Sequence, residues 1–87
     1  MRVIVCNLQM FSNNQVIQVI DTNGHEVMTQ RVEIDDMPRV ISALASQNDI
    51  EKVILKGGVF CEPWAEEIKQ TYTLNYGKNK NFEVEVV

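Results

Sequence analysis

The chain has 87 residues, of which 45% are apolar and 23% are charged, a balance typical of one globular domain with a modest core. Its formal net charge of −4 gives no general attraction to a nucleic-acid backbone. No stretch approaches the roughly 18–20 apolar residues that cross a bilayer, and the N-terminus does not resemble a secretory signal. We therefore expect one domain over residues 1–87, with no membrane segment and a cytoplasmic location.

The first part of the chain predicts three strands joined by short turns. Residues 2–8 form an apolar, β-branched run typical of a strand that is covered on both faces. A second such run covers 15–21, and the return strand of a hairpin extends from about 25 to 34. Between these two strands, Asn23-Gly24 favours a two-residue type I′ turn, in which both central residues need positive φ.

The next segment predicts a helix that begins near Asp35, because an aspartate and a following proline are typical of a first turn. The apolar residues after it share one helical stripe. They are Met37, Val40, Ile41, Leu44 and Ala45.

The rest of the chain predicts a strand, a second helix and a last strand. The strand is short, over 53–55, and ends at Gly57-Gly58. A helix begins near Pro63 and carries an apolar inner face, and residues 82–86 alternate as a strand with one buried side. The inner face of the helix consists of Trp64, Ala65, Ile68 and Tyr72.

The resulting order, β-β-β-α-β-α-β, resembles the ribonuclease H-like fold shared by nucleases, resolvases and actin-like ATPases. The resemblance implies an α/β domain with a mixed five-stranded sheet in the spatial order 3-2-1-4-5. Two right-handed crossovers in one direction then place both helices on the same face. Such folds are frequent among small phage and bacterial proteins, so the cytoplasm expected here is that of the host if a phage encodes the chain.

The same resemblance argues against catalysis. Nucleases of this family hold Mg²⁺ with carboxylates, one of which lies in the first strand, where this chain has Asn7. The fourth strand ends in Lys56, and nothing indicates that Asp21, Glu62 and Glu66 meet. We therefore expect a trimmed domain with no enzymatic activity, no metal and no cofactor.

With both helices on one side, the other face of the sheet has no helical cover. Its middle is predicted to be apolar and its edges charged, a combination that commonly marks an interface. Two copies of the chain, or a partner protein, would pack there. The alternative is that the loop after the first strand, with Met10 and Phe11, folds over the patch.

A ligand crevice is expected where the strand order reverses, between Asn7 and Lys56. The amides of Gly57 and Gly58 and the following helix can hold a phosphate there, although two glycines can equally serve to turn the chain. Cys61, next to a helix start, is either an activated thiol or a small buried residue.

Nucleic-acid binding is the alternative function. Tyr76, Lys78 and Lys80 lie in one polar segment near Tyr72 and Phe82, and aromatic and basic residues together can stack bases and hold phosphates. This alternative describes a nucleic-acid-associated protein or a vestigial nuclease subunit.

Overall fold

The computed structural model describes residues 2–9, 11–47, 50–79 and 81–87. The strands are β1 (Arg2–Asn7), β2 (Asn14–Asp21), β3 (Glu26–Glu33), β4 (Ile50–Lys56) and β5 (Glu83–Val86). The helices are α1 (Met37–Gln47) and α2 (Glu62–Tyr76), preceded by the short 3-10 helices η1 (Ile34–Asp36) and η2 (Gly58–Cys61). The predicted element order is confirmed.

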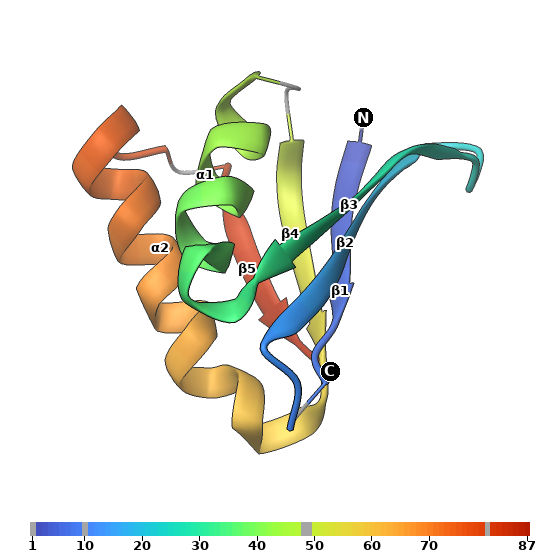
Figure 1. Ribbon diagram of the computed structural model, residues 1–87. Helices are drawn as coiled ribbons and strands as arrows, with labels where there is room; N and C mark the ends of the chain where they lie inside the picture. The colour runs from blue at the N-terminus through green and yellow to red at the C-terminus, as the bar shows by residue number, and fades with distance from the viewer. Residues whose placement is uncertain (1, 10, 48–49, 80) are drawn as a thin grey trace.

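The strands form one mixed sheet in the order β3-β2-β1-β4-β5, as predicted (Figure 1). The strand β1 is antiparallel to β2 and parallel to β4, while β2 is antiparallel to β3 and β4 is parallel to β5. Because β1, β3, β4 and β5 therefore run the same way, their carboxyl ends meet at one end of the sheet, the lower end in Figure 1.

Both helices cover the same face of this sheet, which confirms the expected two-layer arrangement (Figure 1). The stripe predicted for α1 faces the core, where Met37, Ile41 and Ala45 are buried. The inner face of α2 contributes further buried residues, Ala65, Ile68 and Tyr72. The sheet meets them with Ile4, Cys6, Ile17, Val19, Val53 and Leu55.

The hairpin between β2 and β3 differs from the predicted two-residue type I′ turn. Asp21 and His25 close the loop, since the Asp21 amide donates to the His25 carbonyl at 2.9 Å, so three residues connect the strands. The carboxylate of Asp21 accepts hydrogen bonds from the amides of Asn23 and His25, both at 2.9 Å. These bonds favour a turn that ends in Gly24, whose φ is +82°.

In the described part of the chain, no helix is long and apolar enough to cross a membrane.

Candidate interaction surfaces

The helix-free face of the sheet has the predicted apolar middle, made by Val3, Val5, Ile20 and Ile54. Its side chains shield one another: Val5 is only 8% exposed, because it lies between Gln18 of β2 and Ile54 of β4. Val3, Ile20 and Ile54 are half-buried, and Val16, nearer the end of β2 on the same face, is 40% exposed. The middle of this face therefore offers less free apolar surface than the sequence pattern suggests.

The rim of the helix-free face is polar, as expected. Lys52 of β4 forms an ion pair with Glu85 of β5, and this hydrogen-bonded carboxylate raises the pKa of Lys52. On the opposite side, Gln18 donates to a carboxylate oxygen of Glu26 at 3.0 Å, and Thr29 donates to the same oxygen. These bonds fix polar side chains around the apolar middle.

The loop between β1 and β2 does not bring Phe11 over that face, because the side chain of Phe11 is 94% exposed. Met10, the other residue expected to cover it, lies outside the described residues. Gln15 holds this loop in place: its buried amide accepts from the Gln9 amide at 2.8 Å and donates to the carbonyls of Gln9 and Ser12 at 3.0 and 2.9 Å.

A second apolar surface lies at the carboxyl ends of β1, β3 and β4. A pocket of about 170 Å³ opens there, lined by Leu8, Gln9, Ile34, Phe60 and Trp64. In the chain segments that supply these residues, three residues are unusually exposed: Phe11 by 94%, Val59 by 78% and Phe60 by 56%. We call these seven residues, which come from the loop after β1, from η1, from η2 and from the first turn of α2, the carboxyl-end surface.

The crevice predicted at the point where the strand order reverses lies beside this surface. Asn7 and Lys56 pair in register at the ends of β1 and β4, and both are exposed. The amides of Gly57 and Gly58, however, both donate to the carbonyl of Val87, at 3.1 and 3.0 Å. The donors expected to hold a phosphate are thus engaged within the protein.

Gly57 has a second structural role. Its φ of +151° disfavours a side chain, and an added Cβ atom would lie 3.0 Å from the sulfur of Cys61. The glycine allows the chain to leave β4 and enter η2 directly above this sulfur. This role matches the expectation that the two glycines turn the chain.

The two cysteines are free thiols buried in the core. Burial raises the pKa of Cys6 to about 11, with the nearby Cys61 thiol adding to the effect. Burial and the charge of Glu62 raise the pKa of Cys61. This direction is opposite to that of an activated nucleophile. His25, whose side chain is 79% exposed, lies in the hairpin at the far end of the sheet (Figure 1).

The acidic residues are separated by the fold. Asp21 lies at the hairpin end of β2, whereas Glu62 and Glu66 lie in the first turns of α2. Within residues 2–9, 11–47, 50–79 and 81–87, no three histidine, cysteine or acidic side chains come together as a metal site would require.

The candidate residues for nucleic-acid binding are only partly available. Tyr76 is 48% exposed and Lys78 is exposed, whereas Lys80 lies outside the described residues. Tyr72 is buried and stacks on Phe82, with ring centroids 4.1 Å apart and planes inclined by 11°. Tyr72 thus belongs to the core, and Phe82 is half-buried against it, with one ring face covered by Tyr72.

Comparison with known proteins adds little to this picture. No protein-family model and no curated protein matches the sequence. A solved structure described as the crystal structure of PH0822 aligns with 99% of this chain and 78% of its own, at 14% identity and a TM-score of 0.40.

Sequence reasoning missed the carboxyl-end surface. Its signal is present as apolar residues beside turn residues: Met10-Phe11 between Gln9 and Ser12, and Val59-Phe60 directly after two glycines. Trp64, interpreted from the sequence as a core residue, both packs on the core and lines the pocket.

Proposed function

We propose that this chain is a non-catalytic, ribonuclease H-like domain that acts through protein–protein contact, as a homodimer. One observation carries the proposal: the exposure of Phe11, Val59 and Phe60, which lie in the two connections, the loop after β1 and η2, that help to line the pocket at the carboxyl end of the sheet. The element order and the strand order 3-2-1-4-5 support the ribonuclease H-like assignment.

The exposed apolar area of Phe11 and Phe60 reaches the lower end of the range found for the largest apolar patch of a monomer. A phenylalanine offers roughly 150–250 Å², so Phe11 and Phe60 at 94% and 56% exposure together offer about 300 Å². The largest apolar patch of a monomer is typically about 300–600 Å² and is often functional. A stable interface buries about 800 Å² per partner, of which some 60% is apolar. The two rings alone supply more than half of that apolar share.

The helix-free face is the second candidate for the same contact. Its apolar side chains are less exposed than Phe11 and Val59. Val16, the most exposed apolar residue of β2, is 40% exposed, and Val5 is 8% exposed. Burying half-covered side chains yields less free energy per residue than burying fully exposed rings. We therefore assign the dimer contact to the carboxyl-end surface.

Two further features support the non-catalytic and cytoplasmic parts of the proposal. Asn7 and Lys56 occupy the ends of the strands from which nucleases of the resembled family draw carboxylates. Both cysteines are free thiols, as expected for proteins of reducing compartments.

The test is the molar mass in solution, measured by light scattering over a wide concentration range. We expect a dimer, and we expect Phe11→Ser and Phe60→Ser each to weaken it by about 30-fold, the effect of losing an interface anchor. Leu74→Ser is the matched control, because Leu74 is 87% exposed on α2, away from the carboxyl-end surface. Circular dichroism checks that each variant is folded.

Three other results are informative. A dimer that is weakened by Val16→Thr and not by Phe11→Ser assigns the contact to the helix-free face. A strict monomer that binds an oligonucleotide in a salt-dependent manner refutes the homodimer and favours the nucleic-acid function of Tyr76, Lys78 and Lys80. A strict monomer that binds no oligonucleotide refutes the homodimer as well.

A further inference from the structure

The outer edge of the sheet at β5 has backbone groups that point away from the sheet. The amide of Val87 donates to the carbonyl of Leu55 at 2.9 Å and its carbonyl accepts from Gly57, so Val87 faces β4. Since backbone groups alternate sides along a strand, Glu83 and Glu85 also face β4, and Val84 and Val86 face outward. In the described part of the chain, neither valine has a backbone partner on that outer side.

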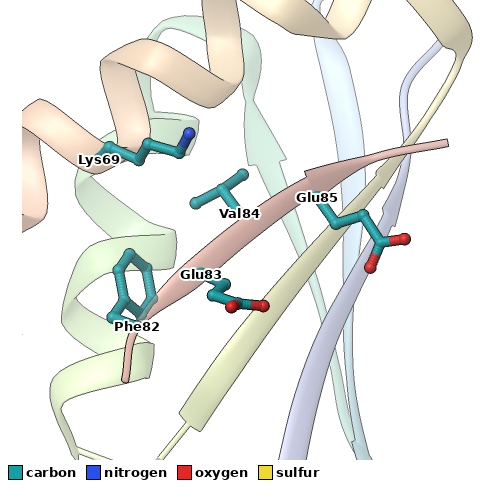
Figure 2. Close-up of a pocket in the computed structure, with 5 residues that line it drawn as sticks. All are labelled: Lys69, Phe82, Glu83, Val84 and Glu85. Carbon is teal, nitrogen blue, oxygen red and sulfur yellow. The ribbon is translucent and has the colours of Figure 1, made fainter. Parts of the chain in front are cut away.

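A groove of about 370 Å³ runs along this edge, between β5 and α2 (Figure 2). The side next to α2 is lined by Lys69, Phe82 and Val84, and the other side carries the carboxylates of Glu83 and Glu85. The groove therefore combines the apolar side chains of Phe82 and Val84, the ammonium of Lys69, and a strand edge that can accept another strand. Of its two carboxylates, that of Glu85 is paired with Lys52.

A second copy of the chain is a poor occupant for this edge. If two β5 strands paired antiparallel about a two-fold axis, the glutamates of one copy would lie opposite those of the other. Like charges that face each other across paired strands destabilise the pairing. Charged edge strands are a common protection against self-association for this reason.

The same charges favour a basic occupant. On the helix-free side two carboxylates face one ammonium, that of Lys52, which is paired with Glu85, so one negative charge remains in excess. An added strand that presents lysine or arginine beside Glu83 forms an opposite-charge pair there, and apolar residues at the alternate positions lie toward Val84 and Phe82. The net charge of −4 adds a longer-range attraction. Addition of a strand to a sheet edge beside a helix is an established mode of peptide recognition.

We propose that the β5 edge binds an extended segment of a partner protein in which basic and apolar residues alternate, as an additional strand next to α2. The basic side chains lie on the helix-free side, and the apolar ones lie in the groove. This surface is separate from the carboxyl-end surface, so the proposal does not depend on the homodimer.

The probe is a blocked hexapeptide of alternating lysine and valine, titrated into the full chain and followed by amide chemical shifts. We expect saturable shifts centred on Val84 and Val86 with a dissociation constant at or below about 1 mM. A peptide of alternating glutamate and valine is the charge control and should not bind. The double variant E83Q/E85Q should weaken binding about two- to tenfold, whereas E33Q, the same charge change on the opposite edge strand, should leave it unchanged.

Backbone N-methylation of the peptide tests the strand pairing without altering the protein. Methylating the valine amides blocks an antiparallel addition, and methylating the lysine amides blocks a parallel one, so one of the two peptides must lose binding. Binding that survives both methylations, equal binding of the glutamate peptide, or shifts centred elsewhere overturns the proposal. The absence of chemical-shift changes at about 1 mM peptide also overturns it. A shift of Val84 that depends on the protein concentration in the absence of peptide overturns it too, because it would assign the edge to a second copy of the chain.

Discussion

Gln15 is a polar side chain in an otherwise apolar position. It faces the helices from β2, it is fully buried, and its amide makes three hydrogen bonds with the backbone of Gln9 and Ser12. A buried polar group is tolerated when its hydrogen bonds are satisfied. Here the satisfied group fixes the loop that presents Phe11.

Replacing Gln15 with leucine removes these three bonds while it keeps a side chain of similar size. We expect Gln15→Leu to lower the free energy of unfolding by about 2 kcal/mol, since a net hydrogen bond contributes about 1 kcal/mol and the exposed loop recovers part of the loss from water. Urea denaturation measures the change. Gln18→Leu is the control, with an expected effect below about 0.5 kcal/mol, because Gln18 bonds only an exposed carboxylate. Equal stability of Gln15→Leu and the parent protein would contradict this role.

The burial of the Cys6 thiol makes the stability of the protein depend on pH. This thiol has a pKa of about 11 in the folded protein, against an ordinary value of 9.0, because burial disfavours the thiolate. Below pH 9 the thiol is protonated in both states, and the stabilisation is fully present. Between pH 9 and 11 the unfolded chain releases a proton that the folded chain retains, so stability falls as the pH rises.

We expect the free energy of unfolding to drop by about 1 kcal/mol between pH 8 and pH 10 on account of Cys6 alone. Urea denaturation under reducing conditions, at several pH values, measures the slope. The Cys6→Ala variant retains the lysines, the tyrosines and Cys61, so its slope should be shallower than that of the parent protein. Identical slopes would show that Cys6 titrates normally in the folded state.

At the scale of elements, β5 depends on its neighbours. It has four residues, it forms an edge of the sheet, and it pairs only with β4. Phe82, just before it, stacks on Tyr72 of α2 with centroids 4.1 Å apart. The aromatic pair therefore packs the last strand against the helix layer. The backbone hydrogen bonds between β5 and β4 hold β5 only to the sheet.

Removing the ring should loosen this connection. We expect Phe82→Ala to cost about 2 kcal/mol of stability, less than a fully buried phenylalanine because the ring is half-buried. Hydrogen exchange should accelerate at the Val87 amide, which bonds β4, more than at amides shared by β1 and β2. Tyr76→Ala is the matched control, since Tyr76 is 48% exposed and its ring lies 5.5 Å from that of Tyr72. Uniform acceleration over the whole sheet would contradict a local role.

At the scale of the whole molecule, the fold distributes negative charge instead of concentrating it. Asp21 is at the hairpin end of the sheet, Glu62 and Glu66 begin α2, and Glu83 and Glu85 follow the β5 edge. In the part of the chain that the structure describes, these groups do not gather three at a time with one another or with the histidine and cysteines. Tight Mg²⁺ binding needs several converging oxygen ligands.

Adding about 10 mM MgCl₂ should therefore shift the melting temperature by less than about 1 °C, compared with NaCl of equal ionic strength. Differential scanning fluorimetry measures the shift. A saturable rise of several degrees that Glu62→Gln or Asp21→Asn abolishes would show that the carboxylates converge on a metal, and it would reopen the possibility of catalysis.

Much of the fold follows from local patterns. The β-branched runs, the helical stripe that includes Met37 and Ile41, and the alternation after Phe82 each specify an element, because period and turn residues are local properties. Two departures occur at this level. The strand predicted over 53–55 extends over Ile50–Lys56, and in the hairpin the Asp21 side chain bonds two amides and converts a predicted two-residue loop into a three-residue one. The turn preferences of Asn23 and Gly24 do not take the hydrogen bonds of the Asp21 carboxylate into account.

The sequence by itself determined the element order and the burial of the core, since hydrophobic period is a local property. The mixed sheet was expected from the resemblance of that order to a known fold, and the helix-free face from the handedness of its crossovers. Only the tertiary structure decided which surfaces are free. Leu8, Ile34 and Phe60 come from three separate connections, and they line one pocket because the parallel strands end together. The outward backbone of Val84 and Val86 likewise depends on the register of β5 with β4. Exposure depends on neighbours distant in the chain, and a local pattern carries no information about them.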